Sequence, residues 1–386
     1  MIKELFNHEE KKVEYIELIY DLIFVYIIGR SNNMLRHVEG GFIPFETYFI
    51  YLLTTLIILQ IWFFTVLFIN RYGTNGAAEY LGLFINMYLL YYMAQGTNSD
   101  WRGYYTQFNV SWALILVNLA VQYLLKLRQC PGKQPEVRRH ILYHIALLLS
   151  GAVIVGLSIP VFQATGLALS PIAMVAGVII TMTVGKGIYR SVPVDFPHLS
   201  ERVMLYVVFT FGEMIISMAG YFEGGFSPNS VYFSLMGFLI VAGLFFIYGY
   251  YYDHVIDREG STNGIGYMLI HILLITMLNN ITIALEFMRE PEIDEVKKHV
   301  FLVASFALYF AFLALTLLFA KKRGDKRGRF LLITCGMTVC FAVLMAALYR
   351  NSKISIAITV VYIYAMLLTN ILHDRRKSSN DLTNNA

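Results

Sequence analysis

The sequence predicts an all-α membrane protein that crosses the bilayer about twelve times. Of its 386 residues, 57% are hydrophobic and only 15% are charged, and the mean hydropathy is +0.59. Soluble domains carry about 25% charged residues. Apolar runs of about 20 residues, the length that a spanning helix needs, recur along the whole chain. No segment between them is long enough to form a soluble domain.

Short polar or basic segments separate the apolar runs. The sixth run is the weakest, because the stretch TGLALSPIAMVAGVIITMTVGKG holds four glycines and a proline, which lower helix stability. Its neighbour, the fifth run, is uninterrupted, so the loss of the sixth span would change the whole topology. The twelve predicted spans are 16–35, 44–69, 76–96, 105–126, 138–162, 167–187, 201–222, 229–252, 263–287, 297–320, 328–349 and 353–373.

The distribution of basic residues predicts the orientation, since lysine and arginine favour the cytoplasmic segments of membrane proteins. With the N-terminus in the cytoplasm, 22 of the 30 basic residues fall in cytoplasmic segments and 8 fall outside. This split favours twelve spans in the cell membrane with both termini cytoplasmic. The N-terminal MIKELFNHEEKKVEY lacks the apolar core of a signal peptide. We therefore expect the first span to stay in the mature protein.

Short sequence patterns also recur between the two halves of the chain. TNG opens both the third and the ninth predicted spans, 188 residues apart. At a similar offset IYDLIF aligns with FGEMII, which matches Asp21 with Glu213. Two halves of six spans in the same orientation are typical of parallel repeats. We predict two six-helix repeats, 1–190 and 191–386, the second ending in a short cytoplasmic tail.

Two carboxylates lie inside the first predicted span. A charge at the bilayer centre costs about 2.5–3.5 kcal/mol on insertion scales, so such residues face the protein interior and mark a pathway or a pair. Glu17 and Asp21 share one helix face with Phe24 and Ile28. They are candidates for proton-titrating or cation-binding acids. Alternatively, they are structural acids bonded to a helix end or an arginine. We expect them to face the seventh predicted span.

The seventh predicted span holds a third acid, Glu213, near its middle. With Thr210 and Ser217 it forms a polar stripe on an otherwise apolar helix. It is a candidate proton site, or alternatively a group that bonds across helices. The cytoplasmic end of this span carries three further residues, whose types also suit a helix start and the positive-inside rule. They are His198, Glu201 and Arg202.

The ninth predicted span is also polar for a membrane helix. Its polar side chains either line a cavity or bond across helices. They are His271, Asn279, Asn280, Thr282 and Glu286. At the start of the fifth span, His140 and His144 have a spacing that can hold a metal. No glutamate completes that pattern, so we interpret them as interfacial residues and predict no metal site.

No enzyme motif is present. The sequence holds no phosphate-binding loop, dinucleotide fingerprint or nucleophile elbow. It also lacks a basic stripe with interleaved aromatic residues, which would suggest nucleic acid. The three cysteines form no C-x-x-C pair, so we expect free thiols. We predict no enzymatic activity, no cofactor and no nucleic-acid partner.

Four sequence blocks resemble a known family. The run 16-IELIYDLIFVYIIG-29 resembles E-L-F-F-D-L-V-F-V, which opens bacterial low temperature requirement A proteins. The run 198-HLSERVMLYVVFTFGEMII-216 resembles their H-x-x-E-R-F-x-L-F-x-I-I-x-L-G-E-S-I. Two shorter blocks also resemble the family: Trp62 followed by 70-NRY-72, and 251-YYD-253. The resemblance implies a multi-pass membrane protein. The family's motif positions are occupied by Glu17, Asp21, Asn70, Arg71, His198, Glu201, Arg202, Gly212 and Glu213.

Two hypotheses of function follow. The first is a transporter or channel-like protein that moves a small solute or ion through a central polar pathway, with buried acids as proton or cation sites and Arg202 or Arg71 as counter-charges. The alternative is a non-transport membrane factor for cold or envelope-stress adaptation. Expected partners are the lipid bilayer, an unidentified small solute or ion, and a second copy of the chain. The predicted pathway residues are Glu17, Asp21, Asn70, Arg71, His198, Glu201, Arg202, Glu213, His271, Asn279 and Glu286.

Overall fold

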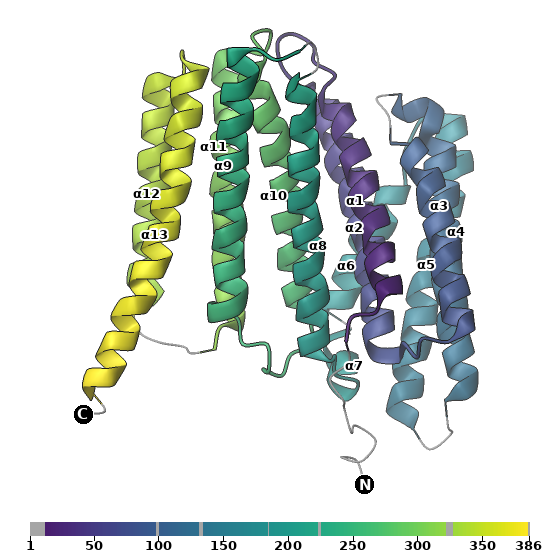
Figure 1. The fold of residues 1–386 in the computed structure, drawn as a ribbon. Helices are drawn as coiled ribbons and strands as arrows, with labels where there is room; N and C mark the ends of the chain where they lie inside the picture. Colours follow the sequence, from purple (N-terminus) through teal and green to yellow (C-terminus); the bar gives the residue numbers. More distant parts are fainter. Residues whose placement is uncertain are drawn as a thin grey trace. The chain divides into compact units, whose positions relative to one another are not determined.

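Helices make up nearly all of the described chain (Figure 1). The structure is a computed structural model that describes residues 12–97, 100–130, 134–183, 185–222, 225–321 and 327–384. In these residues there is no β-strand, and the isolated backbone bridges are Glu39–Phe42 and Ile256–Ala320. The predicted all-α fold is therefore confirmed for this part of the chain.

Each predicted apolar run contains a helix. The sixth run, which glycine and proline weaken, is divided between the 14-residue α6 and the short α7. Short turns extend α8, α9 and α11: η1 (Met218–Phe222), η2 (Tyr251–Val255) and η3 (Thr316–Phe319). The helices are α1 (Tyr15–Leu35), α2 (Phe45–Tyr72), α3 (Ala77–Gln95), α4 (Trp101–Gln129), α5 (Pro135–Thr165), α6 (Ser170–Thr183), α7 (Gly185–Ser191), α8 (Phe196–Ser217), α9 (Pro228–Tyr250), α10 (Ile265–Arg289), α11 (Glu295–Leu315), α12 (Arg327–Leu348) and α13 (Ser352–Asn384).

Nine helices among the described residues are long and apolar enough to cross a membrane: α2, α4, α5 and α8 to α13. Of the others, α1 carries Glu17, Asp21 and Arg30, α3 holds four tyrosines, and α6 is short. The count of twelve spans and the orientation of the termini stay predictions. Some basic residues that support the orientation lie outside the described residues: Lys3, Lys11, Lys133, Lys322, Arg323 and Lys326.

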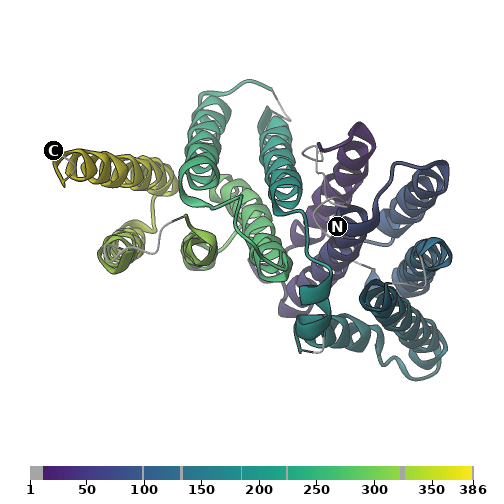
Figure 2. The same cartoon turned by 90° about the horizontal axis from the view of Figure 1, so that it is seen from below.

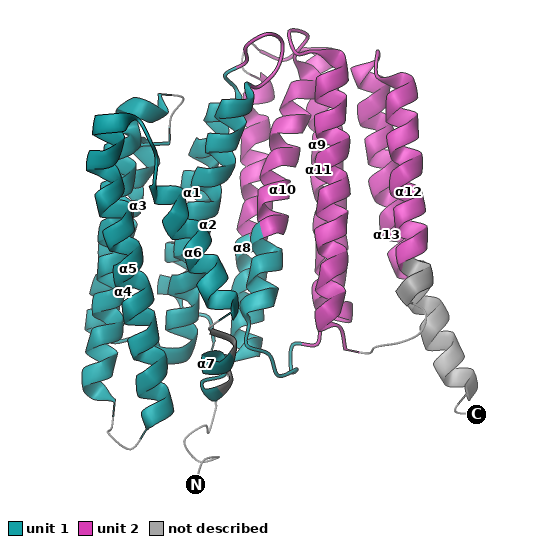
Figure 3. Cartoon of the chain, turned by 180° about the vertical axis from the view of Figure 1, so that it is seen from behind, with its two compact units in different colours: residues 1–37, 44–206, 258–272 teal, residues 38–43, 207–257, 273–386 magenta. Residues whose placement is uncertain are grey.

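The chain divides into two compact units, coloured separately in Figure 3. Unit 1 is residues 1–37, 44–206 and 258–272, and unit 2 is residues 38–43, 207–257 and 273–386. Helices α8 and α10 begin in unit 1 and continue in unit 2. The division into compact units does not show whether the two halves of the chain repeat the same fold, so the two six-helix repeats stay a prediction.

Helix α2 forms the centre of unit 1. The helix is apolar on every side, and 83% of its most apolar 18-residue stretch is buried. Helices α1, α4 and α6 pack against it, as expected for a helix without a polar face. Helices α3, α4 and α5 pack in series within the same unit, which is visible in the end-on view of Figure 2. The polar face of α1 is thereby brought against the most buried helix of the unit.

Unit 2 is held together mainly by α9 and α11 to α13. Helix α13 packs against α9 and α12, and α11 packs against α12. A side chain at Gly243 of α9 would collide with Ile363 of α13, so glycine permits the close approach of these helices. Residues 38–43 also belong to this unit: Phe42 lies with its ring centroid 6.0 Å from that of Phe287 and 5.9 Å from that of Phe301.

The weakest predicted span provides a test of the topology. Alkaline phosphatase, which folds only outside the cytoplasm, should be active when fused after Gly166 and inactive when fused after Asp195. Green fluorescent protein should show the opposite pattern, because α6 with α7 would return the chain to the cytoplasm. Active phosphatase at both positions would show that this segment does not cross the bilayer, and would contradict the twelve-span count.

Candidate functional site

A buried cluster of charged and titratable side chains joins α1 to α8 within unit 1. The Arg202 guanidinium lies between two carboxylates of α1. Its Nε and Nη2 donate to the two oxygens of Asp21 at 3.1 and 2.9 Å, and its Nη1 donates to Glu17 Oε2 at 2.9 Å. His198 Nε2 lies 3.4 Å from the same Glu17 oxygen. All four side chains are at most 1% exposed. We call Glu17, Asp21, His198 and Arg202 the α1–α8 cluster.

The helical repeat explains why these four side chains meet. Glu17 and Asp21 are one turn apart on α1, and His198 and Arg202 are one turn apart on α8, so each helix presents two groups on one face. These contacts confirm the prediction that the acids face the seventh predicted span. The planar guanidinium matches both oxygens of Asp21, a two-point geometry that a lysine ammonium could not reproduce.

Trp62 adds a third N–H donor to Asp21 from α2. Its Nε1 donates to Asp21 Oδ1 at 2.8 Å, and its ring centroid lies 4.6 Å from that of Tyr206. Both rings are buried. Sequence reasoning did not assign Trp62 to the site. The signal that could have found it is the indole N–H, which needs a partner when it is buried in an apolar helix.

Asn70 of α2 positions the His198 ring. The backbone of Asp195 holds the Asn70 amide: Nδ2 donates to the Asp195 carbonyl at 2.9 Å, and Oδ1 accepts from the Asp195 N–H at 3.0 Å. The second Nδ2 hydrogen points to His198 Nδ1 at 3.0 Å. The other ring nitrogen, Nε2, thereby faces Glu17.

Arg71 of α2 has a different role from Arg202. Its Nε donates to the Val192 carbonyl at 3.0 Å and its Nη2 to the Asn263 carbonyl at 3.2 Å. Its guanidinium also lies over the Tyr189 ring, 4.9 Å from the centroid. Arg71 thus ties together three chain segments of unit 1 through carbonyls and an aromatic face. Of the two proposed counter-charges, Arg202 is the one that pairs with the acids of α1.

The remaining predicted site residues lie outside the α1–α8 cluster. His271 is buried in unit 1 and its Nδ1 lies 2.8 Å from a carbonyl one turn earlier in α10. Asn279, in unit 2, donates to a carbonyl of the same helix at 2.8 Å. Three acids are partly exposed: Glu201, Glu213 and Glu286. Asp21 belongs to unit 1 and Glu213 to unit 2, so their equivalence as titrating acids stays a prediction.

His140 and His144 lie inside unit 1, and their place at the membrane interface stays a prediction. Both rings are buried, and their centroids are 4.3 Å apart. His140 Nδ1 bonds to the Tyr72 hydroxyl at 2.7 Å, and His144 Nε2 bonds to the Tyr189 hydroxyl at 2.8 Å. The partners come from α2 and α7, which the basic flank of α5 could not indicate. Within the described ranges, no three metal-ligating side chains gather into a group.

A family model for the bacterial low temperature requirement A protein (LtrA) matches residues 12–367. The match includes helices of both units and every member of the α1–α8 cluster. The chain belongs to the LtrA family. Searches of curated proteins and of solved structures gave no match. LtrA membership and the apolar helices together identify a multi-pass membrane protein, as the sequence blocks imply.

Replacing Arg202 by methionine should destabilise this LtrA protein by about 3–5 kcal/mol, because two buried carboxylates would lose their counter-charge. Unfolding of the purified protein in detergent measures the loss. Adding Glu17→Gln and Asp21→Asn to Arg202→Met should restore part of it.

Glu201→Gln is the matched control, since Glu201 precedes Arg202 on α8 but lies outside the cluster; it should change the free energy of unfolding by less than about 0.5 kcal/mol. An Arg202→Met protein as stable as this control would contradict the structural role of the cluster.

Proposed function

We propose that this protein is a transporter or channel-like protein that moves a small solute or ion, and that the α1–α8 cluster is its proton site. The observation that carries the proposal is that two buried carboxylates of α1, Glu17 and Asp21, share the guanidinium of Arg202. Glu17 also lies beside His198. Buried acids that share one base are candidates for a group that takes up and releases a proton.

Glu17 is the group best suited to take up a proton. Two carboxylates that share a buried site disfavour each other's ionised form, so one of them is the candidate to hold a proton. Both oxygens of Asp21 accept N–H groups, from Arg202 and Trp62. The Glu17 oxygen that accepts from Arg202 also faces His198 at 3.4 Å, so Glu17 has a titratable neighbour on α8. It is also closer to the start of α1, which is the predicted cytoplasmic end.

Protonation of Glu17 would change the attachment of α1 to α8. When Glu17 is ionised, both acids hold Arg202; when it is neutral, Asp21 holds the guanidinium with only weak help from Glu17. A proton then shifts the balance between two packings of these helices, provided that the packings bind it with different affinity. Differential proton binding of this kind is what couples a proton gradient to the movement of a solute.

The second candidate is a non-transport membrane factor for cold or envelope-stress adaptation. One observation favours it: the cluster is fully buried, and Asp21 accepts three N–H groups, two from Arg202 and one from Trp62. A buried network of this kind also serves as a structural lock that specifies one helix packing. In that case the charges stabilise α1 against α8, and no proton moves during function.

Proton flux into liposomes separates the two candidates. The purified protein is reconstituted with the pH-sensitive dye pyranine inside, and a potassium gradient with valinomycin supplies the membrane potential. A mixture of small polar metabolites is added outside. We expect dye acidification above that of protein-free liposomes, and its loss in Glu17→Gln, because the proton site is removed.

Glu46→Gln removes an exposed acid in the first turn of α2, outside the predicted pathway, and is the control; it should keep the wild-type flux. If Glu17→Gln and Asp21→Asn both insert, fold and keep the flux, the proton site proposed here is wrong. If the wild-type protein gives no flux with any solute fraction, the non-transport candidate is favoured.

A further inference from the structure

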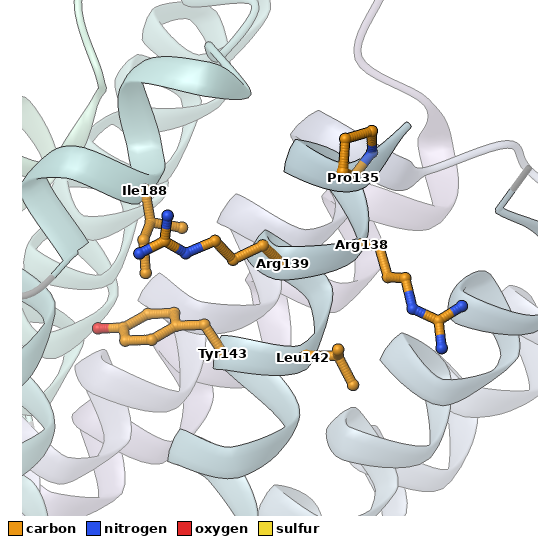
Figure 4. A pocket seen from close by; sticks show the side chains of 6 residues that line it. All are labelled: Pro135, Arg138, Arg139, Leu142, Tyr143 and Ile188. Atoms are coloured by element: carbon orange, nitrogen blue, oxygen red, sulfur yellow. The ribbon is translucent and has the colours of Figure 1, made fainter. Parts of the chain in front are cut away.

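A surface pocket of about 520 Å³ lies where α5 begins, within unit 1 (Figure 4). Figure 4 shows Arg139 extending in the same direction as Tyr143, toward Ile188 of α7, whereas Arg138 extends to the other side, past Leu142. The pocket thus combines guanidinium groups with an apolar and aromatic wall. It is separate from the α1–α8 cluster, since the two sets share no residue. Its lining residues are Pro135, Arg138, Arg139, Leu142, Tyr143 and Ile188.

The two arginines of the pocket are available for an anionic ligand. Both side chains are exposed. Neither takes part in an ion pair or hydrogen bond with another described residue, in contrast to Arg71 and Arg202. Guanidinium groups bind phosphate oxygens through two parallel N–H donors. The Arg139 guanidinium, beside Tyr143 and Ile188, is therefore a candidate phosphate ligand, and Arg138 adds a second positive charge at the same helix start.

An apolar track leads away from the pocket along α5. Leu142 forms part of the pocket and is 45% exposed. Three more apolar side chains of α5 are 42%, 59% and 61% exposed and follow it at intervals of seven, four and four residues, which keeps them on one helix face. They are Leu149, Val153 and Leu157. The charged start of α5 thus changes within one turn into a face suited to hydrocarbon.

We propose that this pocket binds the headgroup of an anionic phospholipid of the surrounding bilayer. The lipid phosphate binds Arg139, Arg138 adds positive charge at the other side of the pocket, and one acyl chain follows the track from Leu142 along α5. The predicted orientation puts this end of α5 on the cytoplasmic side, where basic residues near span ends attract anionic lipids. The combination of phosphate ligands and an adjoining apolar face selects a membrane lipid over a free anion.

Lipid titration of the full, delipidated chain in detergent tests the proposal, with bound lipid counted by native mass spectrometry. Dioleoylphosphatidylglycerol should bind more tightly than dioleoylphosphatidylcholine. The double variant Arg138→Gln, Arg139→Gln should lose about tenfold in affinity for phosphatidylglycerol, the effect of roughly one charge-assisted contact. Arg128→Gln removes an exposed charge at the end of α4, on the same predicted side but outside the pocket, and should leave the affinity unchanged.

Inorganic phosphate and Leu142→Ser distinguish a lipid from a free anion. We expect Leu142→Ser to weaken phosphatidylglycerol binding, and phosphate at millimolar concentration not to displace the lipid. If phosphate displaces the lipid and Leu142→Ser binds the lipid as tightly as wild type, the pocket is a site for small anions and not for a lipid. Equal binding of both lipids, or a folded double arginine variant that keeps wild-type affinity, would overturn the proposal.

Discussion

A guanidinium buried between two carboxylates is the interaction on which the packing of α1 against α8 depends. Arg202, Glu17 and Asp21 are each at most 1% exposed. Arg202 of α8 pairs with both acids of α1, which ties the register of the two helices to their contact. Buried ion pairs add little net stability compared with apolar packing, but a missing partner is costly. The cluster therefore specifies one arrangement by penalising the others.

The same burial motivates the functional proposal. Two acids of α1 share the guanidinium of Arg202, and Glu17 also lies beside His198, whose other ring nitrogen bonds to Asn70. Under the proposal, Glu17 is the acid that a proton-coupled LtrA protein would use, and its side chain is buried.

Hydropathy and helical periodicity predict much of this architecture, because a bilayer demands apolar runs and a helix puts residues i and i+4 on one face. The spacing of Glu17 and Asp21 was enough to predict their shared face and partner helix. It could not choose between Arg202 and Arg71, since that depends on which helices pack together. For the same reason, the spacing could not predict that Trp62 donates to Asp21. Nor could it predict the burial of His140 and His144, whose partners come from distant helices.

The protonation of Glu17 is the central claim, and infrared difference spectroscopy of the protein in lipid tests it most directly. At neutral pH, the spectrum of wild type minus Glu17→Gln should contain the carbonyl band of a protonated carboxylic acid in a water-free site. The corresponding difference for Glu201→Gln should lack it. If the Glu17 difference spectrum instead shows only the bands of an ionised carboxylate, Glu17 holds no proton at neutral pH, and the proton-site account is contradicted.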